Sequence, residues 1–396
     1  MPTLVVTNDF HSTVPTGRTL LAAIREHRAK GALVIDAGDF FGGNAFHEFS
    51  QGGVEEKLLS GSYDAVVPGN HDFADLLRLR EPERFPPVVC ANLRPPAAFA
   101  GSWSSSMMWQ RQNVRIGIIG YLGRQAYDAV PSGERAGFAF VDPTAELIAG
   151  ERDRLVRDGA DVVLGVSHTG FASDVAHQEA GWPLPLVLSG HCHSPWYHWS
   201  SQGRHVVKAP ETGEGLLRID FSAVGPPQFG IEPTPTPSSP EAGAFKEDGL
   251  GETLAAYERW GKEPIGELAS PMPARDDVVR LLAAKAREAS GADAFLISLW
   301  ALRSGLPRKV TRQALLDCVP FDTLLVLVDG GQAAEALAEQ ARQLGEHPVL
   351  SRRPTSRTQP SLATTAYLAD RLDLPVRPLS PSRSLRDVLT DLVRES

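Results

Sequence analysis

Short apolar runs alternate with stretches of helical periodicity over the first 225 residues of the chain. Within residues 19–27, Leu20, Leu21 and Ile24 recur at the spacing of one helical face, which predicts an amphipathic helix. Each apolar run is followed by a short polar segment, as is typical of β-strands. We predict strands over residues 3–6, 32–35, 65–67, 87–89, 115–119, 162–166 and 186–188. This alternation indicates a layered α/β domain.

The pattern changes after residue 219. Residues 225–240 hold six prolines and few large apolar side chains, which indicates a stiff connector and a domain boundary. We therefore predict a first domain over residues 1–225, a proline-rich linker with a bridging helix over 226–265, and a smaller α/β domain over 266–396. Beyond residue 225 we predict helices over residues 253–260, 276–290, 332–344 and 384–393. We predict strands over 294–297 and 323–328, and a polar, arginine-rich loop over 351–360.

Composition and charge narrow the classes of function. Of the 396 residues, 42% are hydrophobic and 22% are charged, which excludes wholesale disorder and fibrous repeats. The net charge of -9 gives no overall field that would attract a nucleic acid, so a phosphate-bearing partner would need a local cation such as a metal ion. Cys90, Cys192 and Cys318 are an odd, scattered set, which favours a reducing compartment over a disulfide framework.

The chain also lacks the patterns of membrane insertion and export. No apolar run approaches the roughly 18 residues that would span a bilayer, and the start of the chain has no basic region followed by a long apolar one. We expect a cytoplasmic protein with no membrane partner. The sequence leaves its oligomeric state open.

Five of the predicted strand ends carry metal-ligating side chain types. Asp, Asn and His offer the oxygen and imidazole donors that suit divalent Mn, Fe, Zn, Co or Ni, and five converging loops could close a site for two ions. Any one of these residues alone would be read as a helix cap or a turn residue. Together they predict a metal centre built from Asp9, His11, Asp39, Asn70, His168, His191 and His193, with His71 beside it.

The order of these motifs resembles that of the calcineurin-like metallophosphoesterases, and most of all the two-domain 5′-nucleotidase family. The resemblance rests on Asp-x-His at 9–11, Gly-Asp-x-x-x-Gly at 38–43, Gly-Asn-His-Asp at 69–72, His168, and Gly-His-x-His at 190–193. It implies a four-layered α/β/β/α sandwich followed by a smaller α/β substrate domain. It is strong up to about residue 225 and weaker beyond.

The resemblance also implies a role for each residue. One metal ion would be bound by Asp9, His11 and His193, the other by Asn70, His168 and His191, with Asp39 bridging both. His71 would contact the phosphate or protonate the leaving oxygen. Arg303 is the candidate substrate-binding residue that the family pattern gives for the second domain. Trp300, which departs from that pattern, is a second candidate as a surface for stacking.

Two departures from the family pattern affect these assignments. The aspartate that normally orients the catalytic histidine is replaced by Ala74, so Asp72 or Asp75 would have to take its place. The Asn-Gly-Gly-Gly-Ile-Arg block of the family reads Ser-Leu-Trp-Ala-Leu-Arg at 298–303, where only Arg303 is retained. The Gly-Gly-Asp-Gly segment that helps clamp the base is also not recognisable.

The sequence therefore predicts a metal-dependent phosphatase that releases inorganic phosphate from a small phosphorylated metabolite, such as a nucleotide, a modified nucleotide or a sugar phosphate. A pyrophosphate-bond or phosphodiester hydrolase acting on a nucleotide sugar or dinucleotide is the alternative, because the same centre serves those bonds. A metal-binding module without catalysis is a third interpretation, suggested by Ala74 and the altered block at 298–303.

Overall fold

The computed structural model describes residues 2–111, 113–193, 197–222, 228–235, 249–329, 333–354 and 360–395. The chain forms two compact units. The first contains residues 1–42 and 50–251, and the second contains residues 43–49 and 252–396. Each unit has its own sheets and its own apolar core.

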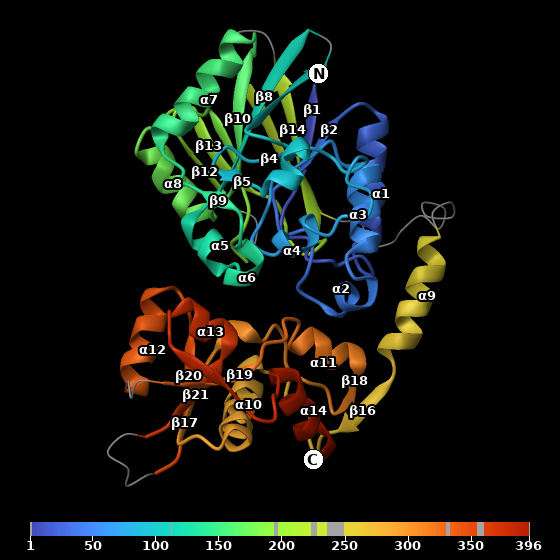
Figure 1. The fold of residues 1–396 in the computed structure, drawn as a ribbon. Coiled ribbons are helices and arrows are strands. Elements are labelled where there is room, and N and C mark those ends of the chain that lie inside the picture. The colour runs from blue at the N-terminus through green and yellow to red at the C-terminus, as the bar shows by residue number, and fades with distance from the viewer. Residues whose placement is uncertain are drawn as a thin grey trace. The chain divides into compact units, whose positions relative to one another are not determined.

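Two sheets face each other in the first unit (Figure 1). One is ordered β15 (Gln228–Pro235), β14 (Gly215–Ser222), β1 (Thr3–Thr7), β2 (Leu33–Asp36), β3 (Ala65–Val66), β4 (Val88–Val89) and β6 (Trp103–Ser104). The other is ordered β12 (His198–Ser201), β13 (Arg204–Lys208), β11 (Leu186–Ser189), β10 (Val162–His168), β8 (Val114–Leu122) and β7 (Ser106–Arg111). Val6 and Ile35 from the first sheet share one buried cluster with Ile118 and Val166 from the second, so the main core lies between the sheets.

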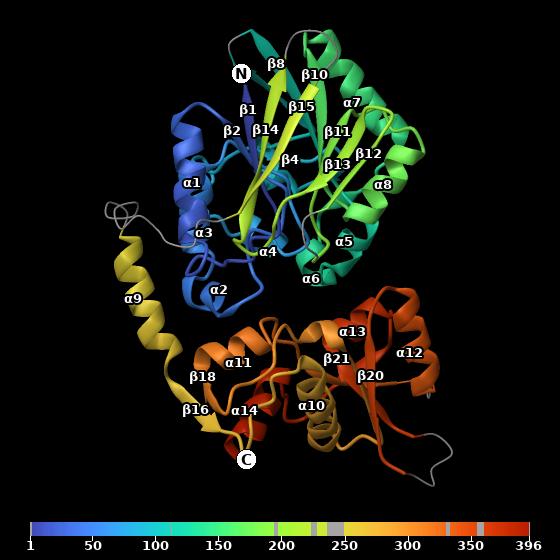
Figure 2. The same cartoon turned by 180° about the vertical axis from the view of Figure 1, so that it is seen from behind.

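Helices cover the outer faces of both sheets, as Figure 2 shows from behind. On the outer side of the six-stranded sheet, Ile148 and Leu155 of α7 pack against Ile119 and Val163. The predicted four-layered α/β/β/α arrangement is therefore confirmed. The helices of the first unit are α1 (Arg18–Ala29), α3 (Gly53–Ser62), α4 (Phe73–Leu76), α5 (Arg124–Ala129), α6 (Ser132–Arg135), α7 (Ala145–Arg157) and α8 (Phe171–Glu179); a 3₁₀ turn (Ala97–Ser102) and a small ribbon of β5 (Leu93–Arg94) and β9 (Ala139–Phe140) complete it.

Strand direction decides where the polar segments meet. β1, β2 and β3 run parallel to one another, and so do β8, β10, β11 and β13. The segments that leave the carboxyl ends of parallel strands lie at the same edge of their sheet, which is the usual ligand-binding edge of an α/β domain.

Part of the predicted connector is a strand. Residues 228–235 form β15, which pairs antiparallel with β14. Its prolines are tolerated because β15 is an edge strand, which pairs with a neighbour on one side only. A backbone N–H that is missing on its open side removes no hydrogen bond from the sheet. The rest of the predicted connector, at 225–227 and 236–240, lies outside the described residues.

The second unit is built on a five-stranded sheet ordered β20 (Pro348–Arg352), β17 (Ala294–Ser298), β21 (Leu362–Thr365), β19 (Leu325–Val328) and β22 (Val376–Pro378). Side chains alternate along β17: Phe295 and Ile297 join the cluster of α10 and α14, whereas Ala294 and Leu296 join that of α12 and α13. The sheet is thus buried on both faces. The remaining elements are α2 (Ala45–Ser50), α9 (Leu250–Gly261), α10 (Arg275–Ser290), a 3₁₀ turn (Leu299–Ala301), α11 (Arg312–Cys318), α12 (Ala334–Gln343), α13 (Ala366–Arg371), α14 (Leu385–Glu395), and the ribbon of β16 (Pro264–Glu267) and β18 (Lys309–Thr311).

Candidate metal centre

The polar residues predicted at the strand ends are brought together in the first unit. Asp9 and His11 follow β1, Asp39 follows β2, and Asn70 and His71 come shortly after β3. His168 is the last residue of β10, and His191 and His193 follow β11. Both sheets therefore contribute side chains to one site.

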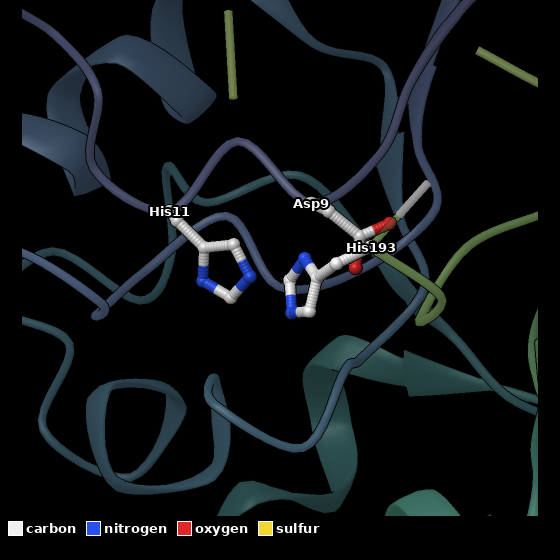
Figure 3. A group of neighbouring side chains, drawn as sticks. All are labelled: Asp9, His11 and His193. Carbon is white, nitrogen blue, oxygen red and sulfur yellow. The ribbon is translucent and has the colours of Figure 1, made fainter. Parts of the chain in front are cut away.

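Asp9, His11 and His193 form the first donor group (Figure 3). Each offers a ligand atom, and these atoms lie within 4.8 Å of one another. The imidazole rings of His11 and His193 have centroids 5.0 Å apart. The backbone N–H of His191 donates to both oxygens of Asp9, at 3.1 and 3.0 Å, and so fastens the loop after β11 to the loop after β1.

Asp39, His168 and His191 form the second donor group, with the same 4.8 Å limit between their ligand atoms. His168 is fully buried. Its Nδ1 lies 2.8 Å from the carbonyl oxygen of Ala37, and because a carbonyl only accepts, Nδ1 carries the proton. Nε2 of His168 is thereby directed to the Asp39 carboxylate at 3.3 Å.

Asp39 lies between the two groups. Its Oδ2 is 3.3 Å from Nε2 of His168 in one group and 3.9 Å from Nε2 of His11 in the other. Its Oδ1 accepts the backbone N–H of His71 at 2.8 Å. This is the position that a residue shared by two ions would occupy.

The backbone is strained at the candidate ligands. Asp9, His11, Asp39 and His191 have φ values of 48°, 48°, 58° and 77°, in the left-handed region that residues other than glycine rarely adopt. Such strain is found where a site dictates the direction of a side chain. At Gly69 an added Cβ would lie 2.2 Å from Oδ1 of Asp39, so this position has room for glycine alone.

Asp72 supports the loops that carry the candidate ligands. Its Oδ2 accepts the backbone N–H groups of Asp39 at 2.9 Å and Gly69 at 2.7 Å, and its Oδ1 accepts that of Phe41 at 3.1 Å. Burial and the charge of Asp39 raise the pKa of Asp72 to about 7, although the hydrogen bonds from Gly69 and Phe41 oppose the rise. Both oxygens of Asp72 are thus engaged with backbone.

His71 lies beside the first donor group, with its ring centroid 5.2 Å from that of His11. Asp75, the other candidate for orienting His71, is on α4, and its Oδ1 would be 2.3 Å from a Cβ added at Gly52. The structure thus separates the two acids: Asp72 binds the loops after β2 and β3, and Asp75 lies against the start of α3. The role of either acid toward His71 stays a prediction.

Protonation differs between the two histidines of the second donor group. Burial opposes the charge of His168, but the Asp39 carboxylate raises the pKa of His168 to about 10. Burial and the charge of His168 lower the pKa of His191 to about 3. Burial alone would raise the pKa of Asp39, but the neighbouring histidines, His168 first among them, hold this pKa well below its ordinary value. His191 is therefore neutral and able to ligate, whereas a metal ion must displace a proton from His168.

The residues present fit a metal centre. Within the described part of the chain, the buried Oδ1 of Asn70 accepts no hydrogen bond, and a buried polar atom of this kind requires a partner. The donor set of carboxylate, amide and imidazole groups suits borderline divalent ions. The geometry thus supports two cation sites that share Asp39, and the identity of the ions stays a prediction.

The two predicted substrate-binding residues lie in the second unit. Trp300 is 46% exposed, its Nε1 donates to the carbonyl oxygen of Gly345, and the guanidinium of Arg275 lies 5.0 Å from its ring centroid. Gly345 lines a hollow of about 400 Å³ together with His347 and other residues. The guanidinium of Arg303 stacks over Phe321 at 5.7 Å.

Three polar residues near the centre were not predicted from sequence. Asn8 donates to Oδ2 of Asp9 at 2.7 Å and accepts the backbone N–H of Ala209 at 3.0 Å. Lys208 and Glu211, which come at the end of β13 and just after it, form an ion pair at 3.1 Å. Asn8 stands beside Asp9 in the first motif, which was the available signal, but no motif marks Lys208 or Glu211.

Comparison with known proteins agrees with this geometry. Residues 2–195 match the family model of the calcineurin-like phosphoesterases. These residues form a calcineurin-like phosphoesterase domain. The match ends two residues beyond His193, so it includes all seven predicted ligands.

The chain is also similar in sequence to part of several larger enzymes. It is 29% identical over 235 residues to a snake venom 5′-nucleotidase of Crotalus adamanteus, covering 52% of this chain and 39% of the venom enzyme. An apyrase of Aedes aegypti is 25% identical over 197 residues, covering 47% of this chain and 34% of that enzyme. The chain thus matches well under half the length of these relatives.

Solved structures share the fold over both units. A 5′-nucleotidase precursor of Thermus thermophilus has a TM-score of 0.79 at 20% identity, covering 100% of this chain and 96% of that structure. The sulfate thiohydrolase SoxB of the same organism also has a TM-score of 0.79, at 16% identity, covering 100% and 94%. The predicted two-domain 5′-nucleotidase architecture is confirmed.

No helix in the described ranges is long and apolar enough to cross a membrane.

Proposed function

We propose that the chain is a phosphoric ester hydrolase with two divalent metal ions, which releases inorganic phosphate from a small phosphate monoester. The observation that carries this proposal is the placement of Asp39, whose carboxylate lies within 3.9 Å of a histidine from each donor group. A centre shared in this way is suited to phosphoryl transfer, in which both the attacking and the leaving oxygen need a nearby positive charge.

The chain's own residues have separate tasks in this mechanism. When bound, the two ions would supply Lewis acidity to the phosphoryl group and lower the pKa of water. Asp9, His11 and His193 would hold one ion, and Asn70, His168 and His191 the other, with Asp39 between them. His71, beside His11, would donate a proton to the leaving oxygen, a contribution of roughly 10²- to 10⁴-fold in rate.

The proposed substrate is a nucleotide, a modified nucleotide or a sugar phosphate. Support comes from the similarity to 5′-nucleotidases and from Trp300, whose exposed indole offers a flat surface for a base. Arg303 would supply a guanidinium for phosphate or sugar oxygens. Since the protein has a net charge of -9, the positive charge that attracts such a substrate would come from the metal ions.

A second candidate function is hydrolysis of a pyrophosphate or phosphodiester bond, for example in a nucleotide sugar or dinucleotide. The match to an apyrase favours it. The same two ions could stabilise either leaving group, so the choice depends on how the substrate is held.

Phosphate release by the metal-stripped protein, with and without added Mn²⁺, tests the proposal. Nitrophenyl phosphate, AMP, a sugar phosphate, a nucleotide sugar and bis(nitrophenyl) phosphate would separate monoesterase from diesterase and pyrophosphatase activity. Asp39→Asn should lower turnover by more than about 100-fold. Replacing a residue that only hydrogen-bonds to a metal ligand typically costs 10- to 100-fold, and replacing a ligand itself should cost more. Asp153→Asn, on the exposed face of α7, is the matched control. Metal uptake without any phosphate release would instead indicate the non-catalytic module.

A further inference from the structure

Glu211 joins a candidate metal ligand to a buried cation. Its Oε2 lies 3.3 Å from Nδ1 of His193 and 3.1 Å from Nζ of Lys208. The side chain of Lys208 is 0% exposed and that of Glu211 is 17% exposed, whereas that of His193 is 37% exposed. A buried ammonium is costly unless it is paired, so Lys208 fixes the Glu211 carboxylate in place.

The fold itself brings this pair to the centre. β11 and β13 are parallel neighbours in which Ser189 pairs with Lys208, so the loops carrying His193 and Glu211 leave the sheet side by side. The loop after β13 is also bound to the loop after β1, because Thr212 N–H donates to the carbonyl oxygen of Asp9 and Ala209 N–H donates to Asn8. Glu211 is therefore held by the same framework that holds Asp9.

A hydrogen bond from Nδ1–H of His193 to this carboxylate has a chemical consequence. A neutral imidazole carries one proton, so a proton held on Nδ1 leaves the lone pair on Nε2. Histidines that bind metal ions commonly donate their second N–H to a carboxylate, which fixes the ring and makes it a better ligand. Among the described residues, Glu211 is not one of the mutually close donors of either group, which is the placement expected of a residue that supports a ligand.

We propose that Glu211, fixed by Lys208, is a positioning residue that holds His193 in the tautomer and orientation of a ligand of the first donor group. This inference rests on the proposed two-metal centre. It adds a carboxylate that lies outside the five motifs and beyond residues 2–195, the range matched by the family model.

Metal titration of the stripped protein by calorimetry, with Mn²⁺ as the probe, tests the proposal. The wild type should bind two ions per chain. Glu211→Ala should weaken one of the two ions by roughly 10- to 100-fold and leave the other unchanged. Glu211→Gln, whose amide oxygen still accepts the imidazole N–H, should recover most of the affinity. Glu214→Ala removes an exposed carboxylate from the same loop and should bind as the wild type does.

The outcomes separate this proposal from the proposed function. A wild type that binds fewer than two ions would contradict the two-metal centre itself. If Glu211→Ala binds two ions with wild-type affinity, the role of Glu211 is contradicted and the two-metal centre is not. Equal losses of affinity in the Ala and Gln variants would have the same meaning. If Glu211→Ala unfolds because it leaves the buried Lys208 unpaired, Glu211→Gln is used to test the role of Glu211. Proton NMR of the zinc-loaded Glu211→Gln variant should show a downfield imidazole N–H signal. Loss of this signal would contradict the role of Glu211.

Discussion

His168 and Asp39 face each other with their side chains 0% and 1% exposed. Burial opposes the charge of His168, but Asp39 raises the pKa of His168 to about 10, so the metal-free imidazole keeps a second proton, on Nε2, throughout the neutral range. A cation that uses Nε2 must therefore release that proton to solvent.

Metal affinity should consequently rise with pH. Below the raised pKa of His168, the ion that uses this histidine displaces one proton, so its affinity should rise by about tenfold for each pH unit. Calorimetric titrations between about pH 6.5 and about pH 8.5, in buffers of different ionisation enthalpy, would measure both the affinity and the proton released. An affinity that is independent of pH over this range would contradict proton displacement from His168.

His71 is predicted to act on the leaving group, since Asn70 beside it is the candidate ligand. His71→Ala should lower turnover by roughly 10²- to 10⁴-fold with alkyl phosphates but much less with nitrophenyl phosphate, whose leaving group needs no proton. The metal content should stay at the wild-type value. Equal losses with both kinds of ester would leave His71 with phosphate positioning alone.

The acid that orients His71 can be identified in the same assay. Asp75→Asn and Asp72→Asn each remove one of the two candidate charges. The variant that reproduces the leaving-group dependence of His71→Ala would identify the partner.

The loops after β2 and β3 are joined by hydrogen bonds to one side chain, that of Asp72. Asp72→Ala would leave the buried N–H groups of Asp39, Phe41 and Gly69 without their acceptor, at a cost of about 3 kcal/mol or more. Amide hydrogen exchange at these three positions should become faster. Asp72→Asn keeps an acceptor oxygen and should change less, and unchanged protection in Asp72→Ala would contradict the supporting role.

Most of the long elements could be predicted from sequence because their periodicity is strong. Apolar spacing places α10 (Arg275–Ser290) and β10 (Val162–His168) within a few residues of their observed bounds. β15 was missed because its prolines argue for a connector, and only its position at the edge of the sheet, which requires the tertiary fold, makes them acceptable. Local pattern contains no information about sheet order.

The candidate site was predictable for a different reason. Asp9, Asp39 and His168 stand in motifs whose order along the chain is distinctive, so spacing alone brought them into one hypothesis. Glu211 has no such signal, because its importance comes from the register of β11 against β13 rather than from its neighbours in sequence. Residues that position the candidate ligands are therefore harder to predict from sequence than the ligands themselves.

Substrate preference is predicted to depend on the second unit. Trp300→Ala should raise KM for nucleotides by about 5- to 150-fold, the equivalent of roughly 1 to 3 kcal/mol for a stacked base, while KM for a sugar phosphate and all kcat values stay unchanged. Trp300→Phe should retain much of the affinity. Leu324→Ala, at another exposed apolar position of this unit, is the control. Equal effects on both classes of substrate would argue against base stacking.

The segment 43–49 interrupts the first unit in sequence but is grouped with the second. Its aromatic residues Phe46 and Phe49 pack against Tyr257 of α9 with ring centroids 5.1 and 5.6 Å apart, and Ala45 N–H donates to Asp317. The chain therefore passes between its units three times, and no single cut divides it into two intact pieces. A fragment ending at residue 251 would keep these two phenylalanines without their aromatic partner, and its complement would lack α2. Gene fusions or recombination that exchange the second unit between relatives would have to exchange this short segment as well.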